Sequence, residues 1–277
     1  MTTVLVIGAA GKTGRAVTRA LTSRGVSVRA AVRSPERSER AYAAGARSIS
    51  VVDLETGQGL VEAVTDVDGV YHLAPNVHPD EVAIAERVAR AAARADLARF
   101  VFHSVLHPHD ASMPHHVRKA EAEEVVRTYL PGATVLRPAA YHQNLVGAAV
   151  AGRLAVPYSL DAPFTNVDLD DVAEAAATVL TRPGHAGLTY DVAGPEVLSV
   201  REQAHVATEV LGHPVEAVRM ELSEWVAGAG ASLTPQARVD LLAMFGAYDR
   251  SGLVGDPTTL RRLLGREPGT WAQALVG

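Results

Sequence analysis

The sequence predicts an α/β protein built on a doubly wound parallel sheet. Apolar runs of strand length recur along the first half of the chain, at residues 4–7, 26–32, 48–52, 69–73, 99–103 and 134–136. Longer stretches with apolar residues at helical spacing lie between them, including residues 15–24, 79–94 and 119–129. Strands that alternate with helices in this way form a parallel sheet with helices on both faces.

Length and composition limit the class of protein. The 277 residues, of which 48% are hydrophobic, suffice for one large domain with a core. A net charge of -5 does not attract nucleic acid or an anionic membrane, and no apolar stretch approaches the roughly 18 residues of a membrane span. The first strand begins too early for a signal peptide, so we expect a cytoplasmic protein. With no cysteine, the chain has no disulfide, thiolate nucleophile or cysteine-held metal.

The first strand runs into a glycine-rich turn with the pattern Gly8-x-x-Gly11-x-x-Gly14. A buried strand that feeds such a turn at a helix N-terminus binds a dinucleotide pyrophosphate, because small residues let the backbone approach the phosphates. The last glycine lets the helix and the strand pack closely. The turn therefore predicts a Rossmann-like fold and these cofactor-binding residues: Gly8, Ala10, Gly11, Lys12, Thr13 and Gly14.

The residue after the second strand indicates the type of cofactor. NAD-selective sites usually carry an acid there for the ribose 2′-hydroxyl, whereas this chain has Arg33. Arg33 and Lys12, with Arg37 as a further candidate, can bracket a 2′-phosphate by charge-assisted hydrogen bonds, so we expect NADPH, with NADH as the alternative. Arg33 and Arg37 could instead belong to a solvated helix start. Asp53, followed by Leu54, would face the adenine or cap the end of the third strand.

Beyond residue 137 the regular alternation fades, and glycine, proline and aromatic residues become frequent. We expect residues 1–137 to form the cofactor-binding core, with a return segment at about 166–195 that contains a strand near 188–192. Residues 138–165 and 196–277 are expected to form a smaller lobe over the carboxyl edge of the sheet, which binds the substrate.

Taken together, the motifs resemble the NmrA-like branch of the atypical short-chain dehydrogenases/reductases. The resemblance covers essentially the whole chain and rests on these features: the glycine turn, Arg33, Asp53-Leu54, His115-x-x-x-Lys119-x-x-x-Glu123, Leu136-Arg137-Pro138, Asn144, residues 166–173, residues 190–195 and residues 264–268. It implies either an NAD(P)H-dependent reductase of quinones, ketones or activated double bonds, or an NADP(H)-sensing regulator without catalysis.

The resemblance also implies catalytic residues, with one departure from the usual pattern. Standard short-chain reductases use Tyr-x-x-x-Lys, and this chain has His115 in place of the tyrosine. His115 and Lys119 are one helical turn apart and share a face, so Lys119 is expected to bind the nicotinamide ribose. His115 either donates a proton or caps the helix that Pro114 begins. Ser104 stands where the family has a serine that contacts a substrate carbonyl, although it could be an ordinary turn residue.

Histidines are concentrated near the expected site, at positions 103, 107, 109, 115 and 116. Such a cluster can bind zinc, but no local i, i+4 pair of histidines sits beside a supporting acid, and a reductase of this type needs no metal. We therefore expect no metal, with His107 and His109 on a loop at the rim of the substrate site.

The remaining expected site residues come from the second lobe. Tyr141 and Asn144 lie three apart, and the resemblance directs Asn144 toward the cofactor and Tyr141 toward the substrate. Two helices at 222–228 and 235–248 could close as a lid and present Trp225, Met244, Phe245 and Tyr248 to an aromatic ligand. The alternative for each large side chain is that it fills the core of the lobe.

These observations favour an NADPH-dependent reductase that transfers hydride to an apolar carbonyl or quinone, such as an aromatic polyketide-type ketone. The proton would come from His115, Ser104, water or the phenols of the substrate. The alternative is a non-catalytic NADP(H) sensor, which would have a closed substrate pocket. An epimerase of nucleotide sugars is disfavoured by the missing tyrosine and by the apolar second lobe.

Overall fold

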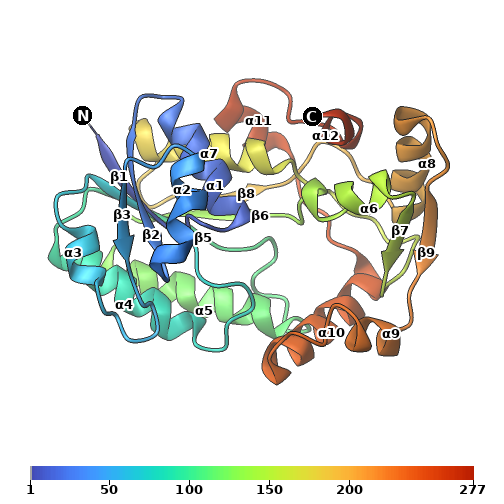
Figure 1. The fold of residues 1–277 in the computed structure, drawn as a ribbon, viewed down its shortest axis with the longest axis horizontal. Coiled ribbons are helices and arrows are strands. Elements are labelled where there is room, and N and C mark those ends of the chain that lie inside the picture. The colour runs from blue at the N-terminus through green and yellow to red at the C-terminus, as the bar shows by residue number, and fades with distance from the viewer. Residues whose placement is uncertain (1) are drawn as a thin grey trace.

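A computed structural model describes residues 2–277 and contains a seven-stranded, all-parallel sheet (Figure 1). Its strands in chain order are β1 (Thr3–Ile7), β2 (Ser27–Val32), β3 (Ser48–Val51), β4 (Gly69–His72), β5 (Arg99–His103), β6 (Thr134–Pro138) and β8 (Thr189–Val192). Their spatial order is β3-β2-β1-β4-β5-β6-β8, so the order reverses between β1 and β4. A crevice forms at the carboxyl ends of strands at such a switch point, and that is where ligands bind in open α/β sheets.

Helices cover both faces of the sheet, which confirms the predicted fold class (Figure 1). One face carries α1 (Lys12–Thr22), α2 (Ser38–Ala43), α7 (Leu169–Thr181) and α11 (Thr258–Leu264), and the other carries α3 (Leu60–Val64), α4 (Glu81–Arg94) and α5 (Pro114–Tyr129). A short 3-10 turn, η1 (Pro35–Arg37), precedes α2. Two separate apolar cores lie on the two faces, as a sheet buried on both sides requires.

Small residues let the first helix and α7 approach each other closely. The side of α1 that faces the protein buries Gly14, Ala16 and Val17, and α7 contributes the buried run 175–177, which is all alanine. At the start of α1, Gly14 lies directly against the turn that follows β1, because a Cβ there would be 2.2 Å from the Gly8 carbonyl oxygen.

The smaller lobe has its own core and its own small sheet. Its elements are η2 (His142–Asn144), α6 (Val146–Val150), β7 (Arg153–Val156), α8 (Val200–Leu211), β9 (Glu216–Arg219), α9 (Leu222–Ala227), α10 (Pro235–Ser251) and α12 (Trp271–Val276). Strands β7 and β9 pair in parallel. Trp271 is fully buried in this core, and its indole N–H donates to the carbonyl of Gln203 at 2.8 Å.

The structure places one segment outside the predicted lobe. Residues 254–266 do not belong to the lobe, because α11 packs on α7 and β8 and buries Leu260 and Leu263 in the core of the sheet domain. The pairing of β7 with β9 had no signal in the sequence. Helix α5 begins at Pro114, where the sequence indicated a helix start, so His115 lies in its first turn. The strand expected near 188–192 is β8, and it returns to the main sheet beside β6 as predicted.

Candidate active site

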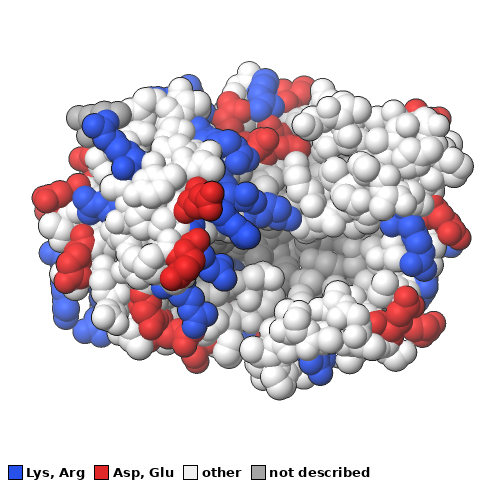
Figure 2. Space-filling view, viewed as in Figure 1, with Lys and Arg blue, Asp and Glu red and all other residues white. Residues whose placement is uncertain are grey.

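A cavity of about 770 Å³ runs along the carboxyl edge of the sheet, between the sheet domain and the lobe. Figure 2 shows it as a hollow in the middle of one face, with Lys and Arg side chains on the side of the sheet domain and mostly uncharged atoms on the side of the lobe. Most of the residues expected in the site line it: Gly8, Ala10, Gly11, Lys12, Thr13, Arg33, Asp53, Leu54, Ser104, His115, Lys119, Tyr141, Asn144 and Tyr248.

The glycine turn has the geometry that an anion site needs. Gly8 adopts a left-handed φ of +77°, and a Cβ at Gly14 would lie 2.2 Å from the Gly8 carbonyl oxygen, so both positions require glycine. Gly11 is the N-cap of α1, and no side chain caps the helix. The N–H groups of the first turn of α1 therefore have no side-chain partner. This turn also contains no acidic residue that would repel an anion.

Arginines lie at the end of the cavity beside β2 and β3. Arg33 is 79% exposed, and its guanidinium is 3.9 Å from the Glu55 carboxylate, a loose contact that leaves it able to bind another anion. Arg37 lies in η1, at the exposed start of a helix, as the alternative for Arg33 and Arg37 expected. Arg37 nevertheless lines the cavity. Asp53 accepts hydrogen bonds from the backbone N–H groups of Glu55 and Thr56, which lower its pKa. One carboxylate oxygen of Asp53 thus caps the loop, as the alternative interpretation expected.

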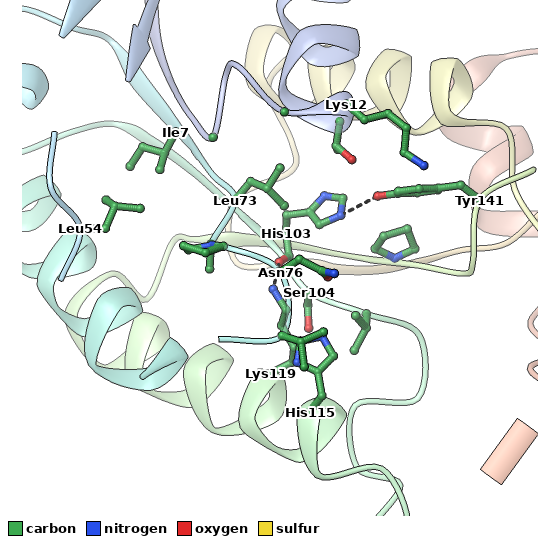
Figure 3. A pocket seen from close by; sticks show the side chains of 18 of the residues that line it. Ile7, Lys12, Leu54, Leu73, Asn76, His103, Ser104, His115, Lys119 and Tyr141 are labelled. Atoms are coloured by element: carbon green, nitrogen blue, oxygen red, sulfur yellow. Dashed lines mark hydrogen bonds between the residues drawn. The ribbon is translucent and has the colours of Figure 1, made fainter. Parts of the chain in front are cut away.

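Lys12 points across the cavity rather than toward Arg33. Its Nζ donates to the Asn144 side-chain oxygen at 2.6 Å and lies 5.5 Å from the centre of the Tyr141 ring. In Figure 3, Lys12 reaches toward Tyr141, at the opposite end of the view from Leu54. The expectation that Lys12 and Arg33 bracket the same phosphate is therefore wrong for this arrangement. Lys12 instead joins the turn to the lobe.

Lys119 and His115 share one face of α5, as their spacing predicts, and both face Glu81. The Lys119 ammonium is 2.5 Å from one oxygen of Glu81 and donates to the main-chain carbonyl of His103 at 3.0 Å. His115 Nδ1 is 3.8 Å from the other oxygen of Glu81, which is fully buried at the start of α4. Burial, and next the Lys119 charge, lower the pKa of His115 to about 3, so its imidazole is neutral at pH 7. His115 makes no capping hydrogen bond, which removes the capping alternative.

The hydroxyl of Ser104 is committed to another group. Its Oγ donates to Glu123 at 2.5 Å, and Arg137 donates two hydrogen bonds to the same carboxylate at 2.9 and 2.6 Å. Because its single hydrogen is used on a buried carboxylate, Ser104 has none left for a substrate carbonyl. The expectation that Ser104 contacts a substrate carbonyl is therefore wrong. Ser104 joins β5 to α5, although it borders the cavity.

Three rings form a hydrogen-bonded chain at the centre of the cavity. Tyr71 and His103 come from β4 and β5, and Tyr141 precedes η2. His103 Nδ1 is 2.5 Å from the Tyr71 hydroxyl, and its Nε2 is 2.9 Å from the Tyr141 hydroxyl. Figure 3 shows the second of these bonds, with Lys119 and His115 below it. Burial and the nearby Lys119 charge lower the pKa of His103 to about 3, so this ring is also neutral.

The far side of the cavity is apolar and comes mainly from α10. Leu241, Met244 and Tyr248 line it, together with Leu253. Trp225 and Phe245, which were expected to face a ligand, pack on each other edge to face at 4.9 Å and lie outside the lining of the cavity. For these two residues the alternative interpretation, a place in the packing of the lobe, is correct.

The loop histidines lie elsewhere. His107 and His109 border a small second hollow with Asp110, Arg137 and Asp191, whereas His116 lines the main cavity. His107 Nε2 donates to the Val254 carbonyl at 2.6 Å and so joins this loop to the segment after α10. Among residues 2–277, no three His, Asp or Glu side chains converge as metal ligands. No helix in that same range is long and apolar enough to cross a bilayer.

The model of the NmrA-like family matches residues 1–261. The chain belongs to this family. Within it, the chain is 34% identical over 221 residues to the (4-alkanoyl-5-oxo-2,5-dihydrofuran-3-yl)methyl phosphate reductase of Streptomyces griseus, covering 76% of this chain and 75% of that protein. It is 27% identical to the NAD(P)H azoreductase of Xenophilus azovorans, covering 98% of this chain and 96% of the other.

Solved structures agree on the architecture of this NmrA-like protein. An NADPH-dependent quinone oxidoreductase of Escherichia coli, solved in complex with NADPH, superposes with a TM-score of 0.84. The two chains are 22% identical, and the match covers 99% of this chain and 98% of that one. At this identity the likeness concerns the fold, which is the Rossmann-like α/β fold predicted from the sequence.

Four residues of the NmrA-like site were missed by the sequence reasoning. Tyr71, Glu81 and Glu123 had no assigned role, and His103 was considered only as part of the histidine cluster. Tyr71 and His103 had a usable signal, since polar side chains at the ends of neighbouring parallel strands meet at the same edge of a sheet. Glu81 and Glu123 are buried charges on helices, and their partners lie 38 and 14 residues away, so sequence spacing does not reveal them.

His72 gives this NmrA-like protein a predicted sensitivity to acid. The His72 ring is fully buried and stacks on Phe102 with centroids 5.5 Å apart, and neither ring nitrogen has a hydrogen-bond partner within residues 2–277. Burial, followed by the Lys119 charge, lowers the pKa of His72 to about 3. The unfolded chain binds this proton near pH 6.5, so stability is lost as the pH falls from about 6.5 toward 3, by about 1.4 kcal/mol per pH unit for each such imidazole.

We therefore expect His72→Phe to reduce the loss of stability between pH 6 and pH 4 while keeping the aromatic stack. Urea unfolding at pH 7, 6, 5 and 4 measures the change in slope. His205→Phe is the comparison at an exposed position, since the His205 side chain is 75% exposed. An equal slope for His72→Phe and the parent chain would contradict the prediction.

Proposed function

We propose that this chain is an NADPH-dependent reductase that transfers hydride to an uncharged, apolar carbonyl or quinone. The observation that carries the proposal is the continuity of the cavity. It extends from the uncapped start of α1, past Lys119 and Tyr141, to the apolar wall of α10. A cofactor alone does not need the apolar part, which leaves room for a second ligand. The named reductases among its relatives support the same activity.

The residues of the sheet domain fit the proposed cofactor. The glycine turn and the α1 N-terminus hold the pyrophosphate, while Arg33 and Arg37 bind the 2′-phosphate by charge-assisted hydrogen bonds. Lys119, held in place by Glu81, binds the nicotinamide ribose, and Asn144 closes the site from the lobe. When bound, NADPH supplies a hydride. The protein contributes alignment of the two ligands and exclusion of water.

The charges around the cavity favour an uncharged substrate. The Lys and Arg residues that line it are Lys12, Arg33, Arg37 and Lys119, all assigned above to the cofactor side or to the centre. The wall formed by Leu241, Met244 and Tyr248 offers no cation for a phosphate ester, the substrate class in the name of the Streptomyces griseus relative. We therefore propose that the substrate here is a flat apolar quinone or aromatic ketone.

Steady-state oxidation of NADPH tests the function with 1,4-naphthoquinone, its 2-sulfonate and 1-tetralone as acceptors. We expect turnover of the neutral compounds and a lower kcat/KM for the sulfonate. Binding of NADPH is measured separately by calorimetry. Tight binding without turnover of any acceptor would favour the alternative, a sensor of NADP(H) that signals to a protein partner.

Arg33 is predicted to set the preference for NADPH. Arg33→Glu replaces a cation with an acid that repels the 2′-phosphate and can accept from a 2′-hydroxyl, so NADPH affinity falls about 10- to 100-fold, the worth of one charge-assisted hydrogen bond, while NADH affinity does not fall. Calorimetry with both cofactors measures the change. Arg40→Glu alters the net charge equally at an exposed position outside the cavity, and it should leave both affinities unaltered. Equal losses in the two variants would show that only the overall charge matters.

A further inference from the structure

The chain of rings Tyr71, His103 and Tyr141 has a defined direction of hydrogen bonding. Tyr71 is fully buried on β4, and within residues 2–277 its hydroxyl bonds to His103 Nδ1 alone. If Nδ1 carried a hydrogen, the Tyr71 hydrogen would be buried without an acceptor, which is costly. Nδ1 therefore accepts from Tyr71. A neutral imidazole has one N–H, so the hydrogen of His103 is on Nε2 and is donated to Tyr141.

This direction leaves the hydrogen of Tyr141 free. The Tyr141 oxygen accepts from His103 Nε2, so its own hydrogen is not used in that bond and can point into the cavity that Tyr141 lines. Burial raises the pKa of Tyr141 to about 12. The phenol is therefore protonated at neutral pH, as a proton donor must be.

The surroundings of Tyr141 also stabilise the phenolate that remains after a proton leaves. His103 Nε2 donates to the phenolic oxygen, and the Lys12 ammonium lies 5.5 Å from the ring centre. These donors are in place before any reaction, so no group has to turn toward the developing charge.

The other residues near Lys119 are less able to donate a proton. His115 is neutral at pH 7 and holds no imidazolium proton. The hydrogen of Ser104 is on the bond to Glu123. Lys119 is bound between Glu81 and the His103 carbonyl. Of Tyr141, His115, Ser104 and Lys119, Tyr141 is the residue that is protonated at pH 7 and whose hydrogen is not used in another hydrogen bond.

We propose that Tyr141 is the proton donor of this site, and that Tyr71 acts through His103 as a positioning residue that directs the Tyr141 hydrogen toward the substrate. The proposal rests on the proposed reductase function. When the carbonyl carbon accepts hydride, its C=O π electrons move onto the oxygen, which takes the proton of Tyr141. The O–H bond of Tyr141 breaks and leaves its electron pair on the phenolate, and water then returns a proton to Tyr141.

A measurement on the protein without cofactor tests the direction of the hydrogen bonds. In protein labelled with ¹⁵N-histidine, the nitrogen shifts of His103, assigned with His103→Gln, report which ring nitrogen carries the hydrogen. We expect the Nε2–H form in the parent chain and a shift toward the Nδ1–H form in Tyr71→Phe, where Nδ1 has lost its donor. A parent chain in the Nδ1–H form would overturn the assigned direction.

Kinetics test the donor. A ketone becomes a strongly basic alkoxide that must be protonated, whereas a reduced quinone leaves as a much weaker base. Tyr141→Phe should therefore lower kcat for 1-tetralone about 100-fold or more and kcat for 1,4-naphthoquinone by less than about 10-fold. The affinity for NADPH should stay within about threefold, because the ring itself is kept.

Tyr158→Phe and His115→Phe are the controls. Tyr158 is another buried tyrosine, packed on Phe164 and Tyr248 outside the cavity lining, so its hydroxyl should not affect the ratio of the two rates. A His115→Phe variant that loses ketone turnover while Tyr141→Phe retains it would overturn the proposal in favour of His115. If the parent chain reduces neither acceptor, the reductase function itself fails, whereas the labelled histidine still reports on His103. If Tyr141→Phe does not fold, Tyr71→Phe replaces it, with a smaller loss for the ketone and a shifted pH profile.

Discussion

Gly14→Ala is expected to weaken NADPH binding and to destabilise the fold. The added Cβ would lie 2.2 Å from the Gly8 carbonyl oxygen and 2.7 Å from Cα of Ala9, and all these neighbours are backbone. Helix α1 must therefore move away from the end of β1, at a cost of about 1–3 kcal/mol for overpacking. The N–H groups at the start of α1 then no longer point at the pyrophosphate, which lowers NADPH affinity about 10- to 100-fold. Urea unfolding and calorimetry measure the two effects.

Gly147→Ala provides the matched control for this substitution. Gly147 lies in α6, and a Cβ added there would have no heavy atom within 4 Å, so alanine adds helix propensity without a clash. Stability should be equal or slightly higher, and NADPH binding should be unaltered. Unimpaired NADPH binding by Gly14→Ala would show that α1 can adjust, and the close contact at Gly14 would then not be a requirement of the cofactor site.

Glu81→Gln is expected to cost about 3–5 kcal/mol of folding free energy, as removal of one partner of a buried ion pair does. Glu81 is fully buried, and the Lys119 side chain beside it is only 6% exposed. The amide is nearly the same shape as the carboxylate but leaves the buried Lys119 ammonium without a counter-charge. Urea unfolding at pH 7 gives the free energy directly.

A second substitution separates buried charge from lost packing. Glu81→Gln combined with Lys119→Met removes the unpaired ammonium as well, so most of the lost stability should return although the site is no longer functional. Glu267→Gln is the exposed counterpart, because Glu267 pairs with Arg261 at 2.7 Å while being 72% exposed, and it should cost less than about 1 kcal/mol. Equal losses at positions 81 and 267 would contradict the role given to burial.

The fold was predictable because its signals are local. The apolar strands and the glycine turn show the parallel sheet and its switch point, and these features depend on neighbouring residues in the chain. The spacing of His115 and Lys119 likewise places both side chains on one face. The start of α5 at Pro114 was also indicated, because proline is favoured in the first turn of a helix.

The details of the site depend on residues that are distant in the sequence. Nothing near Ser104 shows that Glu123 takes its hydrogen, and nothing near Lys12 shows that Asn144, 132 residues away, receives its ammonium. Trp225 and Phe245 have the composition of a ligand site, but whether an aromatic ring faces a cavity or its neighbours is decided by tertiary packing. Such choices leave no periodic pattern in a sequence.

The apolar wall has a different origin in the chain from the rest of the cavity. Leu241, Met244 and Tyr248 all come from α10, while the residues assigned to the cofactor come almost entirely from the sheet domain. Helix α10 is joined to α5 by the ion pair of Arg118 with the fully buried Asp240. Under the proposed function, the wall that faces the substrate therefore comes mainly from one helix, which the Arg118–Asp240 pair holds on α5. Substitution of Leu241 and Met244, with Arg118 and Asp240 retained, is therefore expected to change the preference among acceptors more than the affinity for NADPH.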